Sequence, residues 1–184
     1  MGKITSSCAL VVKKYLEKAH PATPFAKVLA ELTPAERKHF KDLKPDEWVG
    51  YDPYIRLIEA SARLAGVDPL AFAEDCGLYH AKNDLPLLIR MAIRFGGSGL
   101  AMMEADKAWR KYHQPGHLKI MDITPKGAKA RIEGLEGGTP VICAVILGYF
   151  KGGLLLGGAK KLMVVHTRCR FAGDHYCEYV ARWG

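Results

Sequence analysis

The chain has 184 residues, of which 49% are hydrophobic and 25% are charged. This length and balance are those of a globular protein that buries a core without disulfides, and they exclude a fibre or a long disordered tail. The formal net charge of +8 comes from basic residues that are scattered along the chain. Scattered charges fit solvated surfaces more simply than a nucleic-acid groove, so nucleic acid ranks last among the expected partners.

The start of the chain shows no pattern of a membrane span. An apolar run from Cys8 to Val12 is broken by Lys13 and Lys14, and it is too short for a signal sequence or a membrane helix. We therefore expect a cytoplasmic protein. Five cysteines in such a protein indicate buried thiols or a metal site rather than a disulfide framework.

The first part of the chain reads as helices. Apolar spacing predicts a helix from Ala9 to Ala19, and a capping box of the form Thr33-Pro-Ala-Glu36 predicts that another helix starts there. A third helix is expected from Tyr54 to Ala65, ended by Gly66, and a fourth from Leu70 to Asp75, ended by Gly77. The longest helical pattern runs from Asp84 to about Lys111, with a kink or break at the glycine cluster of residues 96–99.

After Pro115 the pattern changes to strands. Residues 117–124 and 128–133 predict a hairpin, with a slip at Ile120-Met121 that a bulge would allow. Thr139-Pro140 opens a helix that reaches Phe150, and residues 160–170 and 175–182 predict a second hairpin. The expected fold is α+β: N-terminal helices packed on a four-stranded antiparallel sheet. We expect one domain over residues 1–184, with a mainly helical part (1–114) and a β-β-α-β-β part (115–184).

Four side chains of the second part are candidate metal ligands. His166, Cys169 and Cys177 lie on the last predicted hairpin, and Cys143 lies on the helix before it. Thiolates and an imidazole are donors that zinc prefers. Their spacing is not a standard zinc-finger spacing, so unrelated buried thiols and a redox-labile pair of Cys169 and Cys177 stay open as alternatives.

The segment GYFKGGLLLGGAKKLMVVHTRCRFAGDHYCEYVARW resembles the closing segment of 4-vinyl-reductase domains. The resemblance implies a zinc ion held by a helix cysteine, a glutamate and two hairpin cysteines, which fall on Cys143, His166, Cys169 and Cys177. Histidine in place of glutamate is a departure, although an imidazole is still a good zinc ligand. Four protein donors leave no open position, so the resemblance implies a structural zinc that contributes to folding.

Upstream, the phrases PFAKVLAELTPAERKHF and PDEWVGYDPYIRLIEA are similar to an uncharacterised bacterial family common in myxobacteria. That family belongs to the same broad superfamily, which also contains haem-nitric-oxide domains and a vesicle-tethering subunit. The resemblance implies an α/β fold that encloses an apolar pocket in several members. Fold analogy of this kind does not fix the function.

If there is such a pocket, the resemblance places it between the long helices and the sheet. The candidate ligand-binding residues are aromatic or end in a polar group: Trp109, Tyr112, His113, Tyr149 and Phe150. They suit an aromatic or other hydrophobic small molecule, and the simpler interpretation is that they are core residues. Haem is the specific rival, with His113 and His117 available, but the Tyr-x-Ser-x-Arg motif that contacts the haem propionates in those relatives does not occur in this sequence.

No pattern predicts an enzyme. Cys76 and His80 lie four residues apart, but no third residue is placed to orient them, and no nucleotide-binding fingerprint is present. We therefore expect a non-catalytic sensory and regulatory domain that passes its signal to a protein partner or acts as a homodimer. A scaffold or tethering protein without a ligand is the first alternative, and a haem-based gas sensor is the second.

Overall fold

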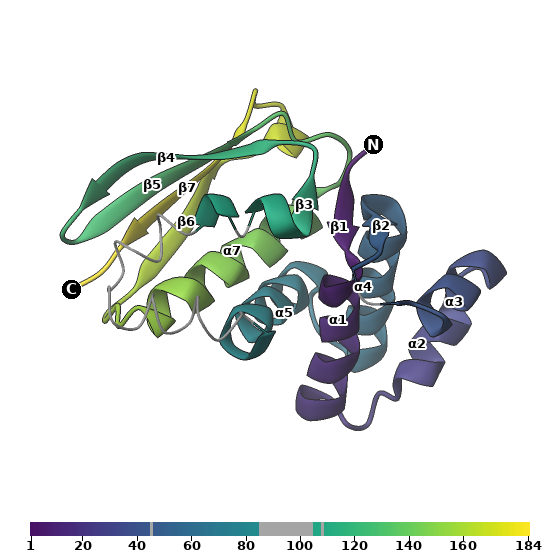
Figure 1. The fold of residues 1–184 in the computed structure, drawn as a ribbon. Coiled ribbons are helices and arrows are strands. Elements are labelled where there is room, and N and C mark those ends of the chain that lie inside the picture. The colour runs from purple at the N-terminus through teal and green to yellow at the C-terminus, as the bar shows by residue number, and fades with distance from the viewer. Residues whose placement is uncertain (45, 85–104, 108) are drawn as a thin grey trace.

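The computed structural model describes residues 1–44, 46–84, 105–107 and 109–184. Its helices lie in successive layers beneath one antiparallel sheet (Figure 1). Most of the predicted long helix, including the glycine cluster, falls in residues 85–104 and lies outside the described residues. Helical structure is present on the far side of that segment, at residues 105–107 and 109–112.

The N-terminal helices form where the sequence places caps and apolar stripes. Strand β1 (Lys3–Thr5) leads into α1 (Ser6–Ala19), and α2 (Phe25–Glu31) and α3 (Pro34–Lys41) follow. The capping box of α3 is confirmed: the Glu36 N–H donates to Thr33 Oγ1 at 3.3 Å, and the Thr33 N–H donates to the Glu36 carboxylate at 3.1 Å. Two orphan N–H groups of the first turn are thereby satisfied.

Strand β2 (Trp48–Gly50) precedes α4 (Tyr51–Ala65), and α5 (Pro69–Asp84) follows. As predicted, α4 ends at Gly66, whose φ of 71° is left-handed. Strands β1 and β2 form a small sheet with β3 (His113–Gln114), in the order β2-β1-β3. The sequence did not predict this sheet, because strands of two or three residues show no measurable period.

The second part has the predicted β-β-α-β-β order. It consists of β4 (His117–Thr124), β5 (Gly127–Glu133), α7 (Pro140–Leu156), β6 (Met163–Arg168), a 3₁₀ turn (Arg170–Ala172) and β7 (Cys177–Arg182). The strands form an antiparallel sheet in the order β4-β5-β7-β6, which confirms the α+β fold with a four-stranded antiparallel sheet. The register of β4 shifts between Ile120 and Asp122, where the sequence pattern slips.

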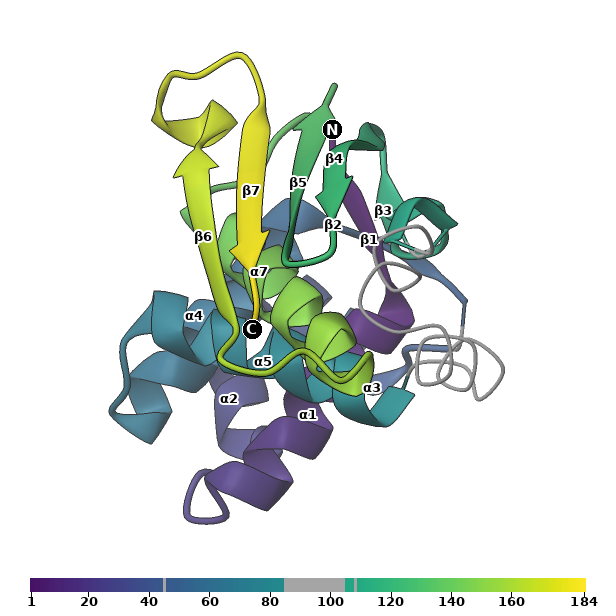
Figure 2. The same ribbon diagram turned by 90° about the vertical axis from the view of Figure 1, so that its left-hand side faces the viewer.

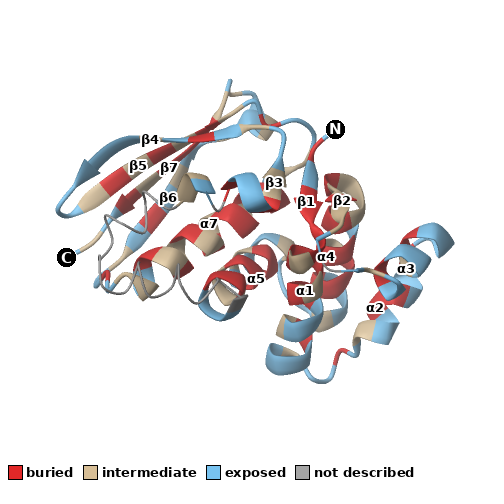
Figure 3. Ribbon diagram, viewed as in Figure 1, coloured by how far each residue is buried: buried red, intermediate tan, exposed pale blue. Residues whose placement is uncertain are grey.

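Helix α7 covers one face of the sheet, and α5 lies on the other side of α7 (Figure 2). The sheet residues that face α7 are buried, whereas the opposite face of the sheet is largely open to solvent (Figure 3). Helix α7 is therefore the central layer of this part and is apolar on most of its surface. Among the described residues, no helix combines the length and apolar character that crossing a bilayer needs.

Helices α5 and α7 cross at glycines. A Cβ atom on Gly148 of α7 would overlap the carbonyl oxygen of Glu74, and one on Gly77 of α5 would overlap the carbonyl oxygen of Val145. The prediction that Gly77 ends the helix is wrong, because α5 continues to Asp84. Gly77 is needed where the two backbones meet, and not as a C-cap.

We predict that Gly148→Ala destabilises the protein by about 2 kcal/mol or more, because an added methyl group forces the two helices apart. Gly153→Ala is the matched control, since nothing lies within 4 Å of a Cβ at that position on the same helix. The control should be neutral or stabilise by up to about 1 kcal/mol through helix propensity. Urea unfolding measures both, and equal stabilities of the two variants would contradict the close-packing account.

Candidate functional site

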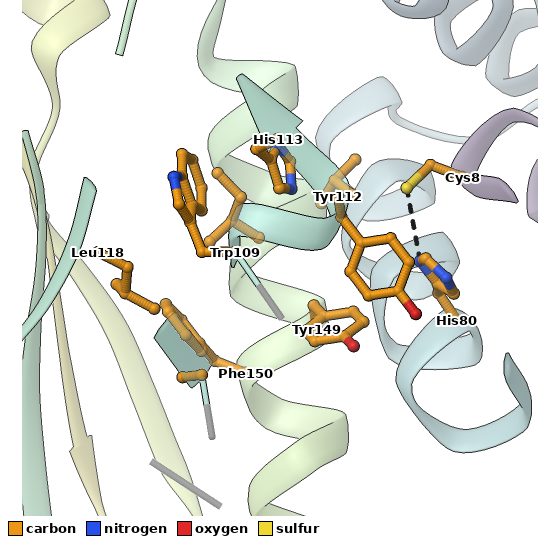
Figure 4. Close-up of a pocket in the computed structure, with 11 residues that line it drawn as sticks. Cys8, His80, Trp109, Tyr112, His113, Leu118, Tyr149 and Phe150 are labelled. Atoms are coloured by element: carbon orange, nitrogen blue, oxygen red, sulfur yellow. Dashed lines mark hydrogen bonds between the residues drawn. The ribbon is translucent and has the colours of Figure 1, made fainter. Parts of the chain in front are cut away.

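A small cavity lies where α1, α5, α7 and residues 105–107 and 109–113 meet (Figure 4). Its volume is about 30 Å³, which is room for one or two water molecules. The wall is largely apolar and aromatic, and it carries two imidazoles and one thiol. The described lining residues are Cys8, His80, Ala105, Trp109, Tyr112, His113, Leu118, Val145, Ile146, Tyr149 and Phe150.

One wall is a stacked pair of rings. Trp109 and His113 are nearly parallel, with centroids 4.3 Å apart and an interplanar angle of 7°. The Trp109 indole N–H donates to the Gly116 carbonyl at 2.9 Å, and His113 Nδ1 lies 3.0 Å from the Tyr51 hydroxyl. Each ring is thus held in place by a hydrogen bond at its edge.

The enclosure of His113 determines its charge. Burial lowers the pKa of His113 from 6.5 to about 3, and the nearby His80 lowers it further in the same direction. The imidazole is therefore neutral at physiological pH. A neutral imidazole keeps a lone pair on one ring nitrogen, which is the form that ligates a metal.

The opposite wall holds His80, which is 3% exposed. The rings of Tyr112 and Tyr149 pack edge-on against it at 4.9 and 5.3 Å, and Cys8 Sγ of α1 lies 3.8 Å from its Nδ1. Sequence reasoning compared His80 with Cys76, its neighbour on α5. The thiol that faces His80 belongs instead to Cys8, which is 72 residues away in the chain, and no local pattern signals that distance.

All five residues predicted for a ligand site line this cavity: Trp109, Tyr112, His113, Tyr149 and Phe150. Their role in binding a ligand stays a prediction. Four of the five are also part of the hydrophobic core or pack against it, so the two interpretations of these aromatics coincide in one place. His117 is exposed on β4.

The four predicted metal ligands also meet, on the sheet side of α7. The donor atoms of Cys143, His166, Cys169 and Cys177 all lie within 4.8 Å of one another. Cys143 Sγ is 3.6 Å from Cys177 Sγ and 3.9 Å from Cys169 Sγ. The hydrogen bond between Cys143 and Cys177 raises the pKa of Cys143 and lowers that of Cys177. The role of these four residues as ligands stays a prediction.

No protein-family model and no curated protein matches the sequence. The fold is similar to solved H-NOX proteins. One from S. oneidensis in the Fe(II)NO ligation state has a TM-score of 0.70 at 12% identity, over 97% of this chain and 98% of that chain. A variant of the Fe(II) unliganded H-NOX protein from K. algicida has a TM-score of 0.68 at 7% identity, over 98% and 97%. At such identities the likeness establishes the fold alone.

Two predictions are corrected by these comparisons. The resemblance to 4-vinyl-reductase domains is wrong, since the structural likeness is to H-NOX proteins. The prediction of a structural zinc ion is also wrong, because the similar H-NOX proteins are solved in Fe(II), Fe(II)NO and Fe(II)CO ligation states, which are states of iron and not of zinc. The thiols can satisfy each other by hydrogen bonds, and the Arg170 N–H also donates to Cys177 Sγ at 3.4 Å. Convergence of these side chains therefore does not by itself require an ion.

We predict that His113 makes the protein acid-sensitive. Its folded pKa lies below its unfolded pKa, so the unfolded chain binds the proton first, and stability falls as the pH drops from about 6.5 towards 3. His113→Phe keeps a ring against Trp109 but does not titrate. Between pH 7 and pH 5 the free energy of unfolding of the wild type should fall by about 2 kcal/mol more than that of this variant, as measured by urea unfolding. The exposed His39→Gln variant is the control, and a His113→Phe curve parallel to the wild type would contradict the prediction.

Proposed function

We propose that this chain is a non-catalytic sensory domain that binds haem in the aromatic cavity and, through it, a diatomic gas. The observation that carries the proposal is the cavity: the imidazoles of His80 and His113 face it from different walls. The fold is similar to that of H-NOX proteins solved in Fe(II), Fe(II)CO and Fe(II)NO ligation states. Imidazole is a common axial ligand of haem iron. When bound, a haem supplies an iron atom that takes up the gas.

The donor chemistry of the cavity fits this group. The low pKa of His113 keeps its imidazole neutral, and the apolar walls suit a porphyrin face. Burial also raises the pKa of Tyr149, so its phenol stays protonated and able to donate a hydrogen bond. The chain's own residues would thus supply a ligating nitrogen, aromatic surface and a hydroxyl donor within one enclosure.

A haem-free sensor of an apolar small molecule is the second candidate. Two observations favour it: the cavity of about 30 Å³ is far smaller than a porphyrin, and its described lining contains no lysine or arginine to pair with propionates. Either ligand would occupy the same walls. We also propose that residues 1–184 act as one domain, because the cavity takes residues from both the helical part and the β-β-α-β-β part.

A hemin titration tests the proposal. We predict that the purified chain takes up one equivalent of hemin, with a sharp Soret band that shifts when the reduced protein is exposed to CO or NO. Thermal unfolding with and without hemin provides a second readout, because a ligand of the folded state raises the Tm.

A chain that gives only the broad absorbance of free hemin, with no rise in Tm, would rule out haem. Phenol and toluene are then the probes for the second candidate. A rise in Tm with either that is lost in Ile146→Trp, a substitution that fills the cavity, would support an apolar ligand.

A further inference from the structure

We propose that the open edge of β6, with the basic residues around its start, binds an acidic extended segment of a partner protein as an added strand. This surface lies on the sheet, away from the aromatic cavity, so the inference does not depend on the proposed ligand. It concerns how this domain could contact a protein partner.

Strand β6 is at the end of the sheet order, so one of its edges is unpaired among the described strands (Figure 2). A strand edge of this kind presents backbone N–H and C=O groups to any strand that comes beside it. Two large apolar side chains on β6, Met163 and Val165, are 49% and 43% exposed. They lie on the sheet face that α7 does not cover, since the alternate residue Val164 is buried.

Basic side chains gather at the start of this strand. Arg182 is the cross-strand neighbour of Met163, and Gly127 is the neighbour of Arg182 on the next strand, which brings the Lys126 turn to the same end. The Gly184 N–H donates to the Lys160 carbonyl at 2.8 Å and ties the Lys160-Lys161 turn to the end of β7. Lys126, Lys160, Lys161 and Arg182 are all exposed, and no ion pair within the described part of the chain engages them.

Charge decides which partner fits. A second copy paired antiparallel at this edge would bring the lysines at the start of one β6 against Arg168 at the end of the other. Arg168 already pairs with Asp174 at 3.7 Å, so the copy offers the lysines a neutral ion pair and not an acidic group. An acidic segment places its carboxylates against these cations instead. Charged side chains can also serve only to keep an edge strand from aggregating. An edge protected for that purpose alone would not be expected to expose two large apolar side chains, as this one does with Met163 and Val165.

The strand edge selects a polypeptide over other anions. A nucleic acid cannot continue a β-ladder, and a bilayer interior cannot satisfy the unpaired backbone groups of an edge. A peptide strand continues the β-ladder and satisfies the unpaired backbone groups. Its main-chain hydrogen bonds provide affinity, and its alternate side chains provide specificity. A segment with apolar residues beside Met163 and Val165 and acidic residues at the end that extends past the start of β6 would set its carboxylates near the lysines.

The test uses the full chain and a fluorescein-labelled peptide that joins a valine-threonine strand of alternating residues to a run of glutamates at one end. We expect saturable binding that weakens with salt, and a loss of about tenfold or more in Lys160→Glu/Lys161→Glu. Lys27→Glu/Lys38→Glu makes the same charge change on exposed sites of α2 and α3, and it should bind like the wild type. Circular dichroism of each variant verifies that it is folded.

A second peptide separates strand addition from simple charge attraction. Methylation of alternate backbone nitrogens removes the donors of one peptide edge and keeps every charge, so this peptide should lose most of its binding. Equal binding of the methylated peptide, equal losses in the two lysine variants, or tighter binding of single-stranded oligothymidine at the same residues would each overturn the proposal. So would a dimer in sedimentation that Val165→Asp dissociates.

Discussion

The packing of the helices under the four-stranded sheet depends on the direct contact between the backbones of α5 and α7. Glycines at positions 77, 148 and 152 remove the side chains that would otherwise separate the helices. A glycine inside a helix costs about 1 kcal/mol in propensity, and three of them are tolerated only because the contact they permit buries much more apolar surface nearby. With α5 held this close, α7 can fill the space between α5 and the sheet as a single layer.

The same contact positions the cavity. Tyr149 directly follows Gly148 on α7, and His80 comes one helical turn after Gly77 on α5. Their rings are therefore brought together by the backbone approach, which explains the edge-on packing of Tyr149 against His80. An aromatic pocket in this position follows from the glycines as much as from the aromatics that line it.

Sequence predicted the elements whose signals are local. The Thr33 capping box, the left-handed Gly66 and both hairpins of the large sheet depend on residues close in the chain, and the structure has each of them. Gly77 was misread because a glycine looks the same at a helix end as at a helix crossing, and only the partner helix, some seventy residues later, distinguishes them. The Cys8–His80 contact was missed because its two residues are 72 positions apart in the chain.

The convergence of Cys143 with the last hairpin was predictable, since a hairpin and the helix before it are neighbours. What occupies such a cluster was not, because donor types alone do not separate an ion site from thiols that hydrogen-bond to each other.

Helix α7 also relates the two proposed binding surfaces. Its middle lines the cavity through Val145, Tyr149 and Phe150, and its end leads through the Lys160-Lys161 turn into β6. A ligand can change the partner surface only if it binds two arrangements of this helix with different affinities.

Helices α7 and α5 are in backbone contact at their glycines, so sliding one helix along the other would drive side chains into backbone. Helix α7 therefore has to move together with α5. A cavity of about 30 Å³ must widen to admit anything larger than water, and the lining residues Trp109 and His113 lie outside the two helices that meet at the glycines. Coupling between ligand and partner would therefore start with the Trp109–His113 stack and reach β6 through the packing of Phe150 against Tyr179 of the neighbouring strand.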